Sequence, residues 1–150
     1  MSIKKQNGIT LIEVMISVFV AAIGVLGVAA LQMNSIKFNH MANTRSHATM
    51  LAYDIIDRMR ANRQQALAGA YDTELKDNPP TGKSIADADI ATWLNELSGN
   101  LPSGDGSIES DGSTFTVTVQ WDESRLDSTR VKVKPENYIP TESFVFVTEL

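Results

Sequence analysis

An uncharged apolar stretch from Val14 to Leu31 constrains this chain more than any other feature of its sequence. Ser17 is the only polar side chain in that stretch. A helix of roughly 20 apolar residues is long enough to cross a bilayer. Because no second stretch of this kind follows, we expect a single membrane-spanning helix over residues 9–31.

The residues before this stretch are polar and include Lys4 and Lys5. Positive charge next to an apolar run keeps that end of the chain on the cytoplasmic side. In an ordinary secretory signal the small-residue cleavage site follows the apolar region, whereas here Gly8 precedes it. We therefore expect residues 1–8 to be a cytoplasmic leader, and cleavage after Gly8 would leave the membrane helix attached.

Glu13 is the one charged side chain between Ile9 and Leu31. A carboxylate at membrane depth costs roughly a few kcal/mol and is a functional hypothesis by default. In one interpretation Glu13 lies near the interface and its side chain reaches water. In the other, cleavage frees an amine on Ile9, and the amine of one subunit neutralises Glu13 of a neighbour. Such a pair would fix the axial register of an assembly, because an unpaired buried carboxylate is penalised.

The segment Gly8 to Val14 resembles the cleavage and methylation motif of type IV prepilins and type II secretion pseudopilins. A short basic leader ends in Gly, an apolar residue follows, and Glu stands fifth after the cut. The resemblance implies that a prepilin peptidase cuts between Gly8 and Ile9 and methylates the new amine of Ile9. Many family members have Phe where this chain has Ile9. The implied fold is α+β: a long N-terminal helix, membrane-spanning in its first half, packs on a small antiparallel β-sheet head.

A second helical half is predicted over residues 32–69, where apolar side chains recur at three- and four-residue steps. These side chains are Ala48, Leu51, Ala52, Ile55 and Met59. We expect one helix from about Thr10 to Ala68, with Gly69 as its C-cap. Gly24 and Gly27 either allow close helix approach in lipid or are simply tolerated.

Residues 70–150 are predicted to form the globular head. Ser84 and Asp87 resemble a capping box, which predicts a short helix from there to about Ser98, ended by Gly99. Asp111-Gly112 is a hairpin signal. About four antiparallel strands are expected: near Ile108, over Thr114 to Trp121, through Val131 and Val133, and over Ser143 to Thr148.

Composition excludes several classes of function. The predicted head holds six basic and fifteen acidic side chains, a net charge of −9, which argues against nucleic acid as a partner. Without cysteine there is no disulfide and no thiolate chemistry. His40 and His47 make a poor metal site by themselves. No catalytic motif is present, so we expect no enzyme activity, no cofactor and no small-molecule substrate.

Arg58, Arg60 and Arg63 form a basic cluster near the end of the predicted long helix. They are either a solvated helix face that pairs with nearby acidic surface, or a docking site for the head or for an adjacent subunit. The sequence leaves both interpretations open.

Two stretches resemble one subgroup of minor pilins, the type IV pilus modification proteins (PilV). They are Ala22 to Gln32, and Arg58 to Arg63 with Tyr71 shortly after. Heads in this family often contain cysteines, which are missing here. The resemblance implies a minor pilin that helps to initiate assembly near the filament tip.

The implied partners are the prepilin peptidase, other minor and major pilins, and an inner-membrane assembly platform. The implied location is the inner membrane, with the head in the periplasm, and then the extracellular filament. A type II secretion pseudopilin, or a membrane-anchored periplasmic binding module that never polymerises, are the alternatives.

Overall fold

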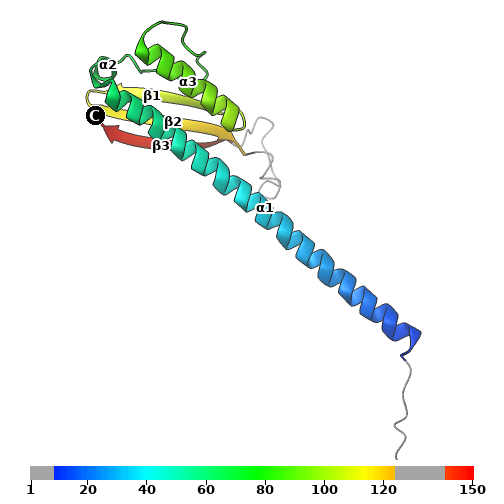
Figure 1. Cartoon of the computed structure of the whole chain (residues 1–150). Coiled ribbons are helices and arrows are strands. Elements are labelled where there is room, and N and C mark those ends of the chain that lie inside the picture. Colours follow the sequence, from blue (N-terminus) through cyan, green and yellow to red (C-terminus); the bar gives the residue numbers. More distant parts are fainter. Residues whose placement is uncertain (1–8, 124–140) are drawn as a thin grey trace, which may run out of the picture. The chain divides into compact units, whose positions relative to one another are not determined.

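The computed structural model describes residues 9–123 and 141–150. The chain divides into two compact units, residues 1–39 and 40–150. The elements in chain order are α1 (Leu11–Ala61), α2 (Arg63–Leu67), α3 (Ile85–Asn100), β1 (Asp105–Asp111), β2 (Thr114–Asp122) and β3 (Thr141–Glu149) (Figure 1).

In the first unit the described residues belong almost entirely to the N-terminal part of α1. Every residue from Ile9 to Ile36 is exposed, including Phe19 at 67% and Leu26 at 70%. This part of α1 is long and apolar enough to cross a membrane, with a mean hydropathy of 2.7 over its best window. The described residues therefore leave this surface uncovered, and its apolar character suits lipid or other helices.

In the second unit the remainder of α1 packs with α3 on one face of the sheet. The predicted apolar stripe is confirmed: all five of its side chains are buried, and so is Ile56. On the strands, Ile108, Val117 and Phe146 point to this same face, because Ile108 pairs with Val117 and Val117 with Phe146. A hydrogen bond of 3.0 Å from Trp93 Nε1 to the carbonyl oxygen of Leu51 joins the two helices inside the core.

The sheet is antiparallel with the order β1-β2-β3. β2 alternates as predicted, with Phe115, Val117, Val119 and Trp121 buried. Gly112 has φ +64° at the first position of a two-residue loop, as a type II′ hairpin turn requires. β1, predicted near Ile108, runs from Asp105 to Asp111. The described residues contain three strands, and the strand predicted through Val131 and Val133 lies outside them.

The predicted continuous helix to Ala68 is wrong at one position. Asn62 interrupts it with φ −114° and ψ 41°, and its side-chain amide donates to the Tyr71 hydroxyl at 3.2 Å. Asn has a low helix propensity, so the break in the helix costs little at this position. Gly69 is confirmed at the end of α2, where φ +78° suits glycine. Bonds from Gly69 N to Ala66 O and from Ala70 N to Gln65 O complete a Schellman motif.

The capping box at the start of α3 is confirmed, since the Ser84 side chain and the Asp87 side chain each accept from the other's backbone N–H. The predicted end at Gly99 is wrong, because α3 continues to Asn100. Leu101 then takes extended geometry, φ −117° and ψ 141°. It precedes Pro102, whose ring disfavours helical geometry in the residue before it, so proline rather than glycine ends the helix.

Replacing Gly69 or Gly99 by alanine should change the free energy of unfolding in opposite directions. Gly69→Ala should lower the free energy of unfolding by about 1–2 kcal/mol, because a side chain is strained at positive φ. Gly99→Ala should raise it by about 0.5–1 kcal/mol, because glycine weakens a helix interior and the added Cβ meets nothing within 4 Å. Urea unfolding of the full chain in detergent micelles, followed by Trp93 and Trp121 fluorescence, measures both. Shifts of the same sign would contradict this assignment of the two helix ends.

Candidate assembly segment and head-docking network

The predicted cleavage site lies at the boundary of the described residues. Gly8 lies outside them, whereas Ile9 is described and is 76% exposed. Glu13 lies in the first turn of α1, where its backbone N–H donates to Thr10 O at 3.1 Å. A negative side chain is favourable at this end of a helix because the unpaired N–H groups carry partial positive charge.

The Glu13 carboxylate is exposed and has no hydrogen-bond or ion-pair partner among residues 9–123 and 141–150. The only side-chain contact at this residue goes to its backbone, where Glu13 O accepts from Ser17 Oγ at 2.7 Å. In an apolar environment an acid without a partner is costly. The carboxylate therefore fits both interpretations, contact with water at the interface and pairing with a group of a neighbouring molecule.

Gly24 and Gly27 lie on this exposed part of α1. A Cβ added at either position would meet nothing within 4 Å. Packing within the chain therefore gives no reason for glycine at these sites. Close approach of another helix remains one of the two interpretations.

Arg58 is the centre of a polar network that joins α1 to α3. Its Nε donates to Asp54 Oδ2 at 2.8 Å on α1, and its Nη1 donates to Asp89 Oδ1 at 3.4 Å on α3. Nη2 also lies 4.0 Å from Glu96 Oε2. Burial acts to lower the pKa of Arg58, but the hydrogen bonds and charges of Asp54, Asp89 and Glu96 outweigh it and raise the pKa above its usual value.

Tyr71 connects this network to the chain after α2. The buried Tyr71 hydroxyl donates to Asp89 Oδ2 at 2.6 Å and accepts from Asn62 Nδ2. Burial, together with the hydrogen bond to Asp89, raises the pKa of Tyr71 to about 12. The hydroxyl is therefore neutral at physiological pH, and Asp89 accepts from both Tyr71 and Arg58.

The other two arginines also contact the head. Arg60 pairs with Asp57 at 2.9 Å and donates to Thr148 Oγ1 on β3 at 3.1 Å. Arg63 donates to the backbone oxygen of Leu150 at 2.9 Å. Each of the three arginines predicted from sequence therefore touches a different part of residues 70–150.

A fourth arginine, Arg45, was missed in the sequence. Its Nε lies 3.6 Å from Glu123 Oε1, and its Nη2 lies 3.9 Å from Glu142 Oε2. Glu123 is 4% exposed and also accepts from Trp121 Nε1 at 3.1 Å. The sequence did contain a signal for this contact. Arg45 stands three residues before Ala48 and therefore lies on the same face of α1 as the buried stripe. A cation at that place can pair with a buried acid, which would otherwise be costly.

No metal centre emerges from the described residues. Among residues 9–123 and 141–150, no three His, Cys, Asp or Glu side chains are grouped to hold an ion. His40 offers its carbonyl oxygen to Thr44 Oγ1 at 3.0 Å, an ordinary helix contact.

Two protein-family models match consecutive parts of the chain, which together cover residues 3–88. Residues 3–29 match the family model of the prokaryotic N-terminal methylation motif, and residues 30–88 match that of the type IV pilin Tt1218. Both matches support a type IV pilin. The long helix and antiparallel sheet agree with the type IV pilin fold, so the predicted fold class is confirmed. Searches of curated proteins and of solved structures found no match.

The matches to these two family models bear on the activity expected of the chain. Type IV pilins are structural, non-enzymatic proteins, and the similarity suggests interaction with other pilins and with a membrane-associated assembly machinery. The apolar part of α1 indicates membrane anchoring and incorporation into a pilus.

The arginine contacts predict unequal costs on substitution. Arg58→Met should lower the free energy of unfolding by about 1–2 kcal/mol, because it leaves Asp54 and Asp89 without their cation in a partly buried network. Arg60→Met removes the exposed ion pair with Asp57 and should lower the free energy of unfolding by only about 0.5 kcal/mol or less. Urea unfolding in micelles compares the two. Equal costs would show that the α1–α3 contacts of Arg58 contribute no more than a surface ion pair.

Proposed function

We propose that this chain is a minor pilin of a type IV pilus that takes part in initiating assembly near the filament tip. One observation carries the proposal: the Gly8–Val14 motif leads directly into a helix whose apolar side chains are exposed from Ile9 to Ile36. The minor-pilin assignment is supported by the Ala22–Gln32 and Arg58–Arg63 stretches, which resemble PilV.

Assembly then follows from packing. The precursor inserts once in the inner membrane, the prepilin peptidase cuts after Gly8, and the amine of Ile9 is methylated. The apolar surface of α1 leaves lipid for a bundle of pilin helices. Glu13, which has no partner among the described residues of its own chain, pairs with the N-terminal amine of a neighbour and fixes the register.

The arginines have a separate role in this proposal. Arg58, Arg60 and Arg63 hold the head on the amphipathic half of the helix rather than recruiting an adjacent subunit. Their contacts with Asp89, Thr148 and Leu150 support this role. The stability comparison of Arg58→Met with Arg60→Met tests this role for Arg58, which makes the more buried contacts.

The proposed partners are the prepilin peptidase, other minor and major pilins, and the inner-membrane assembly platform. The proposed topology places the N-terminus in the cytoplasm and the head in the periplasm before assembly. Lys4 and Lys5 support this orientation.

Processing predicts a specific mass change. In native membranes the protein should lack Met1–Gly8 and carry one added methyl group on Ile9. In a strain without the prepilin peptidase it should keep its full, unmodified mass. Intact-mass spectrometry measures both. Full mass in both strains would sink the pilin proposal and leave a membrane-anchored periplasmic binding module.

Glu13→Gln tests the register role without changing the size of the side chain. The variant should insert and be cleaved, yet its amount in the sheared pilus fraction should fall about ten-fold or more, because a buried amine loses its partner. Ser17→Ala, one turn further along α1, is the control and should assemble normally. Normal incorporation of Glu13→Gln would refute the proposed pair.

Deleting the gene for this chain distinguishes a pilus subunit from a subunit of a type II secretion system. Loss of surface pili with intact type II secretion would support a pilin. The reverse phenotype would identify a pseudopilin, because the N-terminal motif is common to both.

A further inference from the structure

Within the second unit, α1 also has an exposed side, away from its buried stripe. This side consists of Ala42, Asn43, Ser46, Met50 and Tyr53, and we call it the outer face. Residues at these steps of one, three and four positions lie along one side of a helix. Met50 is 67% exposed and Tyr53 is 54% exposed, so two large side chains point away from the core of the head.

The outer face contains no Lys, Arg, Asp or Glu. From Phe38 to Tyr53 the sequence has only one residue of these types, Arg45. Arg45 lies on the side of the buried stripe, with its Nε 3.6 Å from an oxygen of the buried Glu123. The side of a surface helix that faces water usually carries charged side chains. A side without charge can instead be buried by a partner at low cost, because no charge has to leave water.

Hydroxyl groups on and beside the outer face already have partners within the helix. Ser46 Oγ donates to the carbonyl oxygen of Ala42 at 3.0 Å, and Thr49 Oγ1 donates to that of Arg45 at 2.9 Å. Such bonds to the preceding turn satisfy the hydroxyls without any group from outside. An apolar side chain placed over Ser46 would therefore leave no unpaired hydroxyl behind it.

Tyr53 is positioned for contact with a partner. Its ring packs against that of Phe146 on β3, with 5.6 Å between the ring centroids. A side chain that is already ordered loses little conformational entropy when a partner covers it. Protein interfaces are enriched in Tyr and Met and depleted of charged side chains at their centre. Met50 and Tyr53 therefore have the composition of an interface centre.

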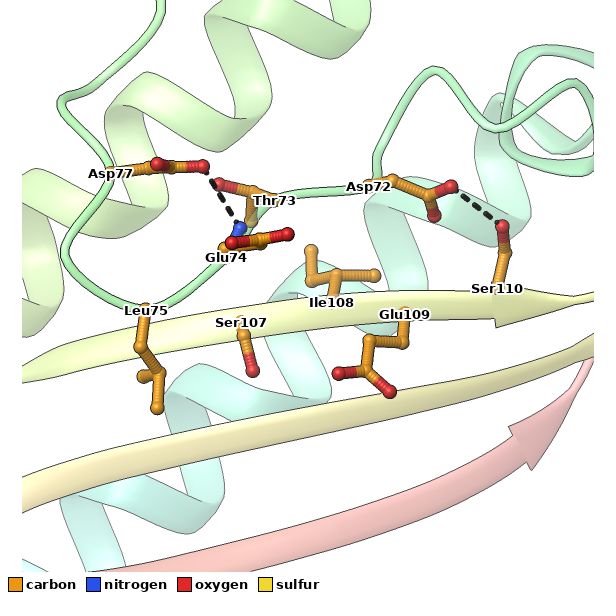
Figure 2. Close-up of a pocket in the computed structure, with 9 residues that line it drawn as sticks. All are labelled: Asp72, Thr73, Glu74, Leu75, Asp77, Ser107, Ile108, Glu109 and Ser110. Atoms are coloured by element: carbon orange, nitrogen blue, oxygen red, sulfur yellow. Dashed lines mark hydrogen bonds between the residues drawn. The ribbon is translucent and has the colours of Figure 1, made fainter.

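The opposite character is found at the edge of β1. There, residues 72–77 and β1 line a pocket with the carboxylates of Asp72, Glu74, Asp77 and Glu109 (Figure 2). An apolar helix placed against this pocket would take those acids out of water, which is costly. Of the two surfaces, the outer face is the one that suits an apolar partner.

We propose that the outer face binds the apolar N-terminal helix of a neighbouring pilin subunit, with Met50 and Tyr53 at the centre of the contact. The exposed apolar side chains of α1 from Ile9 to Ile36 show the kind of helix surface that needs such cover. Ala42 and Ser46, one turn apart, are small enough to let a second helix approach closely. This inference rests on the proposed function as a pilin and adds a contact in the head to the one made by the membrane segment.

Site-specific photocross-linking of the full chain in piliated cells tests the partner. The photoreactive amino acid p-benzoylphenylalanine replaces Met50, and mass spectrometry identifies the cross-linked peptide. Cross-links from this position should end in the apolar N-terminal helix of another pilin, and they should disappear in a strain without the prepilin peptidase. The control places the same amino acid at Thr92, an exposed and uncharged position on α3, and should give no such product.

A charge introduced on the outer face tests its contribution to assembly. Met50→Lys should lower the amount of the chain in the sheared pilus fraction about five-fold or more, because the new charge would be buried against an apolar helix. Thr92→Lys adds the same charge on α3 and should leave that amount unchanged. Both positions are exposed, so the urea midpoint of each variant in micelles should equal that of the unchanged chain.

Several outcomes would overturn this inference while leaving the pilin proposal in place. They are normal incorporation of Met50→Lys, an equal loss in Thr92→Lys, and cross-links from position 50 that end in the same chain, in lipid or in the head of another subunit. Absence of the unchanged chain from the pilus fraction is a different result, because it would contradict the proposed function itself and this inference with it.

Discussion

The helix α1 carries two different apolar surfaces, and the rest of the structure depends on how each is covered. From Ile9 to Ile36 the side chains are exposed on all sides. Further along, one stripe from Ala48 to Met59 is buried against α3 and the sheet. A single helix can therefore belong to a membrane or filament in its first part and to a folded head in its second. The burial of apolar area is the main driving force in both cases.

Polar contacts complement the apolar packing in the second unit. α1 contributes the cations, and the residues after it contribute most of the acids. Arg58 with Asp89, and Arg45 with Glu123, are the two contacts in which an acid is substantially buried. Removing one member of such a pair costs more than the pair itself adds, because the remaining charge stays buried. These pairs therefore help to specify how α1 fits against α3 and against the end of β2.

The sequence reveals the elements whose signals are local. Ser84 and Asp87 predict the start of α3, Gly69 predicts the end of α2, and the alternation of Phe115 to Trp121 predicts β2; each is confirmed. The two errors have different causes, a contact with Tyr71 at Asn62 and a stronger local signal, Pro102, at the end of α3. Asn62 leaves helical geometry while bonding to Tyr71, and α3 passes through Gly99 until Pro102 imposes its end.

What the sequence by itself determined is the character of the N-terminal segment. An apolar run, a glycine before it and one acid within it can be read without coordinates, because membrane crossing and the cleavage motif depend only on neighbouring residues. Only the tertiary structure decided which acid each arginine meets, and that β1 and residues 72–77 enclose an acidic pocket. Asp89 and Arg58 are 31 positions apart, and β1 meets residues 72–77 through a bridge between Thr73 and Ile108, 35 positions apart in the chain. Contacts of this kind depend on chain topology, which local spacing does not encode.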